Sequence, residues 1–111
     1  MLRDNMKLVG KLSIAVNDEI VQEVNNLVVT TGKNYVASRI KDATATAMSH
    51  MAIGTGSTSP AAGDTALGNE SARVALTSTT VTNADVAYVA SFGAGTGTGA
   101  ITEAGLFNSS S

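Results

Sequence analysis

The sequence contains no cysteine, a single histidine and few aromatic residues, which make up 4% of the chain. Without cysteine the chain cannot form a disulfide framework, hold a metal through thiolates or attack a substrate with a thiol. The hydrophobic residues, 43% of the chain, are mainly alanine and valine, so individual buried side chains are small. Because buried apolar area stabilises a fold by roughly 25 cal/mol per Å², we expect a modest core and a monomer of marginal stability that a partner completes.

An excess of positive charge and a long apolar run are also missing. The formal net charge is −2, so lysine and arginine are too few to neutralise a phosphate backbone, and nucleic-acid binding is disfavoured. Residues 1–7 are polar and charged, and the apolar stretch after them is interrupted by Gly10, Lys11 and Ser13. Neither a signal peptide nor a membrane-spanning helix fits this pattern, and we expect no membrane partner and a protein made in the cytosol. The length of 111 residues predicts one domain, 1–111.

The N-terminal part of the chain has the two-residue period of strands, followed by a helical period. Apolar residues of one parity predict a strand at 8–16, and a second strand is predicted at 20–29, where Val21, Leu27 and Val29 break strict alternation. The turn residues between the two strands, 17–19, predict an antiparallel hairpin over 8–29. Apolar residues then recur at helical spacing, which predicts one short helix at 32–41 with its apolar residues in the core. We expect a threonine hydroxyl, from Thr30 or Thr31, to cap its start.

The remainder of the chain, 50–107, alternates short apolar runs with turn-rich segments. The segment 57–68 holds the only proline among glycine, serine, threonine and aspartate, and predicts a long surface loop. Strands are expected at 50–53, 73–82, 86–92 and 100–107, with an irregularity near Thr79–Thr80. The pattern predicts a mainly β fold, a small antiparallel β-sandwich-like domain of five to six strands with one short helix near 32–41.

Residue types that carry catalysis or bind metals are present but not in the patterns that such sites need. His50 would have to serve any Ser-His-carboxylate arrangement, and no G-x-S-x-G motif surrounds it. The carboxylates Asp64, Glu70, Asp85 and Glu103 form no dense D-x-D-x-D-G run that would bind a divalent cation. Glu70 lies three residues before Arg73, and we expect the two to form an ion pair. The sequence therefore predicts no catalytic residue and no metal site.

Two glycine-rich segments superficially resemble phosphate-binding loops. Gly54-Thr55-Gly56 follows a predicted strand, but the third glycine of a G-x-G-x-x-G motif is replaced by Ser59, and Pro60 blocks an immediate helix. The segment 93–99 lacks the Lys-Ser/Thr of a P-loop and suits a hairpin tip. We therefore predict no cofactor, and we expect Gly54 and Gly56 to adopt positive φ where the chain turns into the 57–68 loop.

Several short sequence motifs resemble those of tailed-bacteriophage virion proteins, a group described as tail fibre or structural proteins. The likeness covers about 25–108. It is carried by NLVVTTGKN at Asn26–Asn34, HMAIGTGS at His50–Ser57, PAAGDTALGNE at Pro60–Glu70 followed by Arg73, and EAGLFN at Glu103–Asn108. None of these motifs is a catalytic signature. The resemblance implies a β-sandwich-like module that assembles in multiple copies on a virion, after a stage in the host cytoplasm.

This resemblance leads to expectations about function and partners. We expect a non-enzymatic structural protein that attaches or builds a tail-associated appendage (fibre, collar or baseplate). Its partners are other copies of itself, with a trimer as one expected form, and other virion proteins. The alternatives are a capsid decoration protein and a receptor- or glycan-binding module at a fibre tip. An exposed aromatic ring beside polar loop groups favours the glycan-binding alternative, whereas a ring-poor surface with unpaired edge strands favours the structural module.

We expect the interface with other chains to involve the 57–68 loop and the strand at 100–107. Leu67 is the predicted apolar anchor of the loop, and Glu70 and Arg73 are expected to fix its return to the next strand. The strand at 100–107 is expected either to have an edge that a neighbouring chain covers or to belong to a longer parent chain. Its predicted interface residues are Ile101, Leu106 and Phe107.

Overall fold

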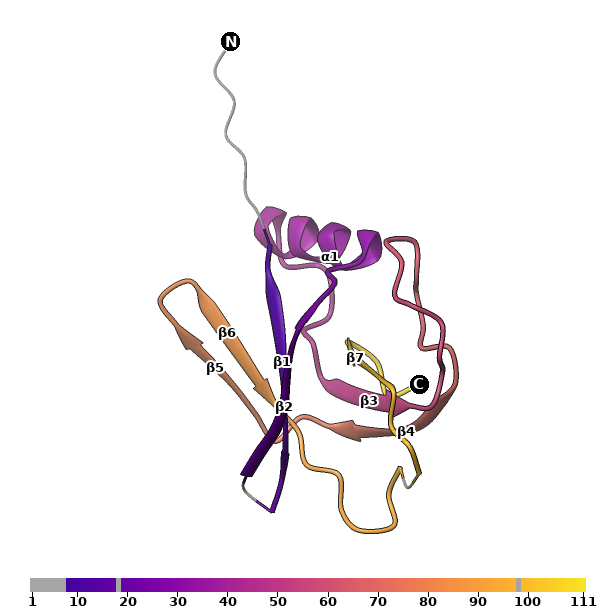
Figure 1. Cartoon of the computed structure of the whole chain (residues 1–111). Coiled ribbons are helices and arrows are strands. Elements are labelled where there is room, and N and C mark those ends of the chain that lie inside the picture. The colour runs from indigo at the N-terminus through magenta and orange to yellow at the C-terminus, as the bar shows by residue number, and fades with distance from the viewer. Residues whose placement is uncertain (1–7, 18, 98) are drawn as a thin grey trace. The chain divides into compact units, whose positions relative to one another are not determined.

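The computed structural model describes residues 8–17, 19–97 and 99–111 (Figure 1). These residues form one helix and seven strands, all paired antiparallel, which confirms the mainly β fold with a single helix. The elements are β1 (Gly10–Val16), β2 (Glu19–Asn26), α1 (Thr30–Lys41), β3 (His50–Gly54), β4 (Glu70–Ala75), β5 (Ser78–Thr82), β6 (Asp85–Val89) and β7 (Glu103–Phe107). Three parts of the sequence-based predictions lie outside the described residues, namely the polar start 1–7, Asp18 of the predicted turn and Thr98 of the 93–99 segment.

The strands form three small sheets, with the orders β1-β2, β4-β3-β7 and β5-β6. The chain divides into two compact units. One unit contains β1, β2 and α1 together with the loop segment Pro60–Thr65, and the other contains β3 to β7. The loop predicted at 57–68 is therefore shared, because its middle part belongs to the first unit and its two ends to the second.

The first unit begins with the hairpin of β1 and β2. Leu12 faces Val24 and Ile14 faces Gln22, and the register then shifts, so that Val21 is left without a partner in the ladder. This bulge lies where strict alternation breaks in the sequence. On the other side of the hairpin, Lys11 Nζ lies 3.2 Å from a carboxylate oxygen of Glu23.

The helix α1 starts earlier than predicted, and the predicted threonine cap is absent. The capping residue is Val29, whose side chain makes no capping hydrogen bond. Instead, the N–H of Thr30 donates to the carbonyl oxygen of Ala62 at 2.8 Å, so a backbone acceptor from the loop satisfies one of the free N–H groups of the first turn. The prediction that the apolar helix residues are core is wrong for Ile40, which is 67% exposed, while Tyr35 and Val36 are half-buried.

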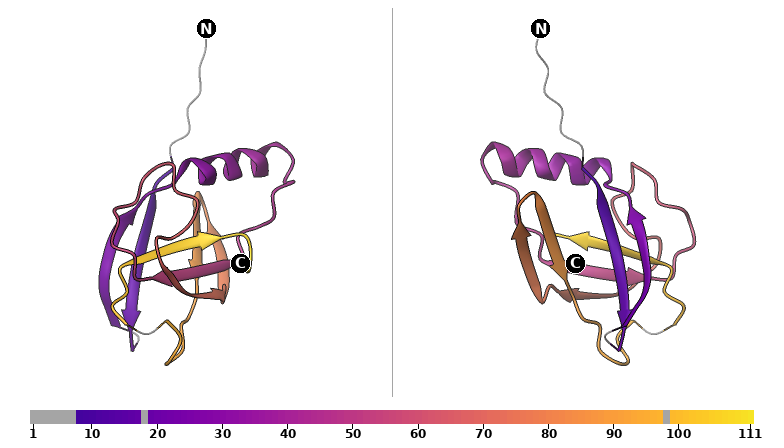
Figure 2. Two further views of the ribbon diagram at one scale, coloured as in Figure 1. Left: turned by 90° about the vertical axis from the view of Figure 1, so that its right-hand side faces the viewer. Right: turned by 60° about the vertical axis from the view of Figure 1, so that its left-hand side comes forward.

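The second unit is built on the three-stranded sheet, in which β3 lies between β4 and β7 (Figure 2). Ala52, at the centre of β3, faces Arg73 of β4 and Gly105 of β7. It is 0% exposed and is the one fully buried hydrophobic residue within the described part of the chain. The core is thus as small as the composition predicts.

The region predicted as one strand at 73–82 forms two strands, which raises the number from the predicted five to six to seven. The N–H of Leu76 donates to Ser49 at the end of the three-stranded sheet, whereas the N–H of Thr77 donates to Val89 of β6. The chain therefore changes its hydrogen-bonding partner between these two residues, and the irregularity lies there and not at Thr79–Thr80.

The segment 93–99 is not a hairpin tip. The strand before it, β6, pairs with β5, and the strand after it, β7, pairs with β3, so the segment connects two different sheets. Gly97, at φ 66°, packs on the side chains of Ile53 and Ala72. A left-handed backbone and this close approach explain a glycine at this position. No helix of the described residues combines the length and apolarity that crossing a membrane requires.

Candidate protein-protein interface

Glu103, the first residue of β7, holds two distant segments together. Its carboxylate accepts hydrogen bonds from the backbone N–H groups of Gly56, Gly68 and Asn69, each at 2.7 Å. The first donor follows β3 and the other two precede β4, so one side chain closes both ends of the 57–68 loop. We call this arrangement of one carboxylate and three N–H groups the Glu103 clamp.

Glycine is required at the clamp because the carboxylate approaches the backbone closely. A Cβ on Gly54 would lie closest to the backbone carbonyl oxygen of Asn69 and 2.6 Å from Oε2 of Glu103, and a Cβ on Gly56 would lie 2.5 Å from the same carboxylate oxygen. Neither glycine has positive φ, so the prediction of a left-handed turn at these two residues is wrong. Gly56 leaves space for the Glu103 side chain, and Gly54 leaves space for the Asn69 backbone as well as for Glu103, so both positions need space and not conformational freedom.

The clamp favours the charged form of its carboxyl. The hydrogen bond from the Asn69 N–H lowers the pKa of Glu103 below its ordinary value, and the bonds from Gly68 and Gly56 act in the same direction. Partial burial opposes them by raising the pKa. The three donors are backbone groups just beyond the end of β3 and just before the start of β4, and together they favour the anionic form of the Glu103 carboxylate.

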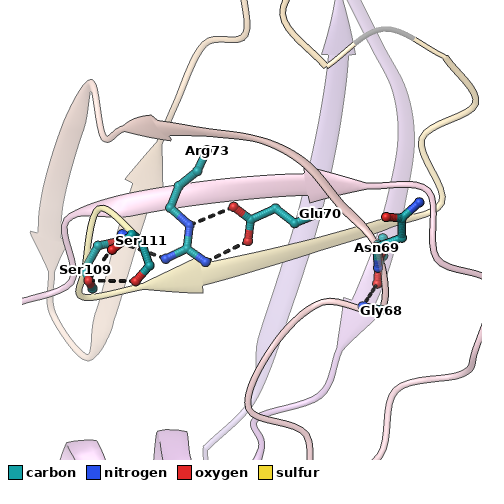
Figure 3. A network of polar contacts seen from close by, with 7 residues as sticks. Gly68, Asn69, Glu70, Arg73, Ser109 and Ser111 are labelled. Atoms are coloured by element: carbon teal, nitrogen blue, oxygen red, sulfur yellow. Dashed lines mark hydrogen bonds and ion pairs between the residues drawn. The ribbon is translucent and has the colours of Figure 1, made fainter.

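A second polar group ties β4 to the end of the chain (Figure 3). Arg73 donates from Nε and Nη2 to the two carboxylate oxygens of Glu70, at 3.0 and 2.7 Å, and from Nη1 to the carbonyl oxygen of Ser109 at 3.0 Å. The guanidinium carbon also lies 3.8 Å from the centroid of the Phe107 ring. The predicted Glu70–Arg73 ion pair is present, and the arginine side chain is only 12% exposed.

Small residues at the middle of the sheet make this packing possible. Arg73, Ala52 and Gly105 are directly paired across the three strands and therefore share one face of the sheet. A Cβ on Gly105 would lie 2.9 Å from the Phe107 ring and 3.2 Å from Cδ2 of Leu67. The ring and the leucine thus occupy the space that a side chain at 105 would need.

Five of the six predicted interface residues come together at this sheet. Glu70 and Arg73 lie on β4, Leu106 and Phe107 lie on β7, and Leu67 reaches Gly105 just before β4 begins. Leu67 and Phe107 are half-buried within their own chain. Ile101 is apart from them, because β7 begins two residues after it, and it is 37% exposed.

Most of the exposed large apolar side chains of the described residues lie on the two hairpins, which the predicted interface did not include; Val9, Leu27, Ile40 and Ile101 are exposed outside them. Val81 on β5 and Val86 on β6 face each other in the ladder and are 69% and 48% exposed. The further exposed members are Val16, Ile20, Val21 and Val24 on β1 and β2, and Val89 on β6. The sequence marks these β-branched residues as strand formers, and only the three-dimensional arrangement shows that the hairpins leave them uncovered.

The residues considered for catalysis or metal binding are His50 and the carboxylates of Asp64, Glu70, Asp85 and Glu103. Ser49 Oγ and His50 Nδ1 are 2.7 Å apart, which joins two consecutive residues at the start of β3. Either atom can be the donor, depending on the tautomer of the ring. In the described ranges, no three side chains of histidine, aspartate or glutamate gather in a way that could hold a metal ion.

The aromatic rings bear on the glycan-binding alternative. The four rings of the chain, those of Tyr35, Tyr88, Phe92 and Phe107, are each half-buried. One face of Phe107 is already covered by the guanidinium of Arg73. A fully exposed ring on which a sugar could stack is therefore missing from the described residues.

Comparison with known proteins adds no relative: no family model, no curated protein and no solved structure matches the chain.

Proposed function

We propose that this chain is a structural protein of a bacteriophage virion, a β-rich module that assembles in multiple copies and attaches or builds a tail-associated appendage through protein-protein contacts. The observation that carries the proposal is a contrast among the described residues between one fully buried hydrophobic residue, Ala52, and the many exposed valine and isoleucine side chains on the hairpins. Full burial of one such side chain by a partner contributes roughly 1.5–3 kcal/mol. Association thus supplies the apolar burial that the chain lacks alone.

The arrangement of the hairpins supports the same interpretation. Each hairpin is a two-stranded sheet, and an isolated two-stranded hairpin is at best marginally stable in water. Each strand in such a pair has one edge whose backbone N–H and C=O groups lack a partner in the sheet. Unpaired edges beside exposed apolar side chains are what a module that packs against other chains needs.

The positions of the phage-like sequence motifs also support a structural role. Ala52, the Glu103 clamp and the Phe107 ring are all contributed by these motifs, at His50–Ser57, Pro60–Glu70 and Glu103–Asn108. All of these interactions hold the three-stranded sheet together. Half-buried rings favour the structural module over the glycan-binding tip, because a sugar site needs an exposed ring.

Light scattering coupled to size exclusion, on the full chain over a hundredfold range of concentration, tests the proposal. We expect a discrete oligomer that dissociates on dilution, because the exposed apolar side chains are buried only in the assembled state. Intact mass spectrometry of the same sample identifies the chain that assembles. A stable monomer at every concentration would contradict assembly of the chain with itself.

A further inference from the structure

The strand β5 has an open edge with unusual chemistry. Its only neighbour in the sheet is β6, and among the described elements β5 contacts no other. In an antiparallel pair, alternate residues direct their N–H and C=O groups away from the partner strand. The outer edge of β5 therefore presents backbone donors and acceptors that a further strand can bind.

Charge distinguishes β5 from the other strands that have an open edge. Its sequence, Ser78-Thr79-Thr80-Val81-Thr82, contains no charged residue, no proline and no glycine. Charged side chains and proline are the usual protection of an edge strand against pairing. Each of the other outer strands within the described residues has at least one charge: Lys11 on β1, Glu19 and Glu23 on β2, Glu70 and Arg73 on β4, Asp85 on β6, and Glu103 on β7.

We infer that β5 pairs with β5 of a second copy of the chain, antiparallel and about a two-fold axis, to give a continuous sheet of order β6-β5-β5-β6. Because β5 carries no charge, pairing it with β5 of a second copy brings no like charges together. If β2 paired with β2 of a second copy, Glu19 and Glu23 of one chain would lie near Glu19 and Glu23 of the other. The inference rests on the proposed self-assembly and specifies its partner and its strand.

The turn of the hairpin sets the register of this pairing. Thr82 and Asp85 close a two-residue turn, and the closing pair of such a turn exchanges hydrogen bonds. By alternation, Thr80 directs its backbone groups to β6, while Thr79 and Val81 direct theirs outward. Pairing through these outward groups along the whole of Ser78–Thr82 centres the axis on the middle residue, so that Thr80 faces Thr80 of the second copy and Thr79 faces Val81 of the second copy.

The pairing also extends an apolar face. Val81 and Val86 are directly opposed on one face of the hairpin, and Tyr88 lies on the same face two residues further along β6. In the four-stranded sheet, the valines of both copies lie on the same side. Two exposed patches then become one surface that a further copy or another virion protein can cover.

Single cysteines test the register, because the chain has no cysteine of its own. Residues in a non-hydrogen-bonded antiparallel pair have Cα atoms about 4.5 Å apart, within the range of about 4.4–6.8 Å that a disulfide spans. Under mild oxidation at a concentration where the chain is oligomeric, we expect Thr80→Cys to give a covalent dimer. The matched control is Ala87→Cys, which faces Thr80 on β6 and is also exposed. In the order β6-β5-β5-β6, the cysteines at position 87 of the two chains would be three strand spacings apart, about 14 Å, and should stay uncrosslinked.

A charge at the same two positions tests the contact without a covalent bond. Thr80→Lys places a like charge at the axis and should raise the dissociation constant of the dimer at least tenfold, whereas Ala87→Lys should change it less than twofold. An even number of copies with selective crosslinking at Thr80 supports the inference. A trimer, equal crosslinking of the two cysteine variants, or an oligomer unaffected by Thr80→Lys would overturn the β5 pairing and leave assembly standing. A monomer at every concentration would contradict both.

Discussion

The three-stranded sheet and the two hairpins, both built largely from small side chains, differ in the interactions that hold their strands together. In the sheet, polar groups replace a large core: the Glu103 clamp joins β7 to the segments after β3 and before β4, and Arg73 joins Glu70, Ser109 and Phe107. The contacts described for the hairpins are simpler. On β1–β2, Lys11 and Ser13 bond to Glu23 on the exposed side of the hairpin.

We propose that this difference separates the part of the chain that satisfies its own polar groups from the part whose apolar side chains a partner covers. The sheet satisfies its polar groups internally, and among the described residues no buried side-chain nitrogen or oxygen lacks a hydrogen bond. The hairpins expose their apolar side chains to water, and Val81 is 69% exposed. We therefore expect substitutions in the sheet to change the stability of the monomer, and substitutions on the hairpins to change association first.

The largest effect is expected from filling the space around the Glu103 clamp. Gly56→Ala would place a Cβ 2.5 Å from the Glu103 carboxylate, so either the loop or the carboxylate must move. Overpacking of this kind costs about 1–3 kcal/mol of unfolding free energy. Urea unfolding of the full chain measures the loss, and hydrogen exchange should locate it in β3 and β7 and not in β1 and β2.

Gly63→Ala is the matched control for this substitution. Gly63 lies in the same loop region and does not have positive φ, and a Cβ added to it would have no atom within 4 Å. Alanine at such a site stabilises a protein by about 0.4–1 kcal/mol through the unfolded chain. Equal losses for the two variants would mean that the clamp does not depend on the space at Gly56.

A smaller effect is expected from Arg73→Lys. Lysine keeps the charge but loses the two parallel hydrogen bonds to Glu70 and the flat guanidinium over Phe107. We expect a loss of about 1–2 kcal/mol in the free energy of unfolding of the sheet. Lys33→Arg, the reverse exchange at an exposed position of α1, should change the same quantity by less than about 0.5 kcal/mol. A loss for Arg73→Lys no larger than the change for Lys33→Arg would show that the arginine geometry is not required.

The sequence predicted the local features of this site and missed its long-range ones. The Glu70–Arg73 pair spans three residues, and strand alternation placed Leu106 and Phe107 on a strand, so both could be read directly. The donors of the Glu103 clamp lie 34 to 47 residues away in the sequence and are backbone N–H groups, which leave no side-chain signature. The one signal in the sequence was the group of glycines at Gly54, Gly56 and Gly68, which marks a close approach to the backbone as readily as a turn.

The split of the predicted strand 73–82 has a similar cause. Leu76 and Thr77 continue the β-forming composition without proline or glycine, so nothing local marks the point at which the chain leaves β3 for β6. The exposure of the hairpin valines could not be inferred from the sequence either. Alternation shows which residues share a face of a strand, but not whether another element covers that face.

The smallest expected effect is a difference in how pH and salt act on Glu103 and Glu23. Both carboxyls have a pKa below the ordinary value of 4.5: Glu103 through the N–H groups of Asn69, Gly68 and Gly56, and Glu23 through a hydrogen bond from Lys11, the charge of Lys11 and a bond from Ser13. A carboxyl with a lower pKa in the folded state stabilises that state above pH 4.5, and the contribution is lost as the pH falls through the folded pKa. Stability should therefore fall below pH 4.5, and less steeply in Glu103→Gln and in Glu23→Gln.

Salt separates the two carboxyls because their partners differ. The Lys11–Glu23 pair is exposed, and at 1 M salt the screening length is about 3 Å, so most of its attraction is lost. The bonds to Glu103 come from uncharged backbone groups at 2.7 Å and do not depend on a distant opposite charge. In urea unfolding between pH 5 and pH 3, the difference between the parent chain and Glu23→Gln should shrink in 1 M salt, while the difference from Glu103→Gln should remain. If salt removed both differences equally, the sheet would be held by screened charges like those of the hairpin, and the contrast between the two regions would fail.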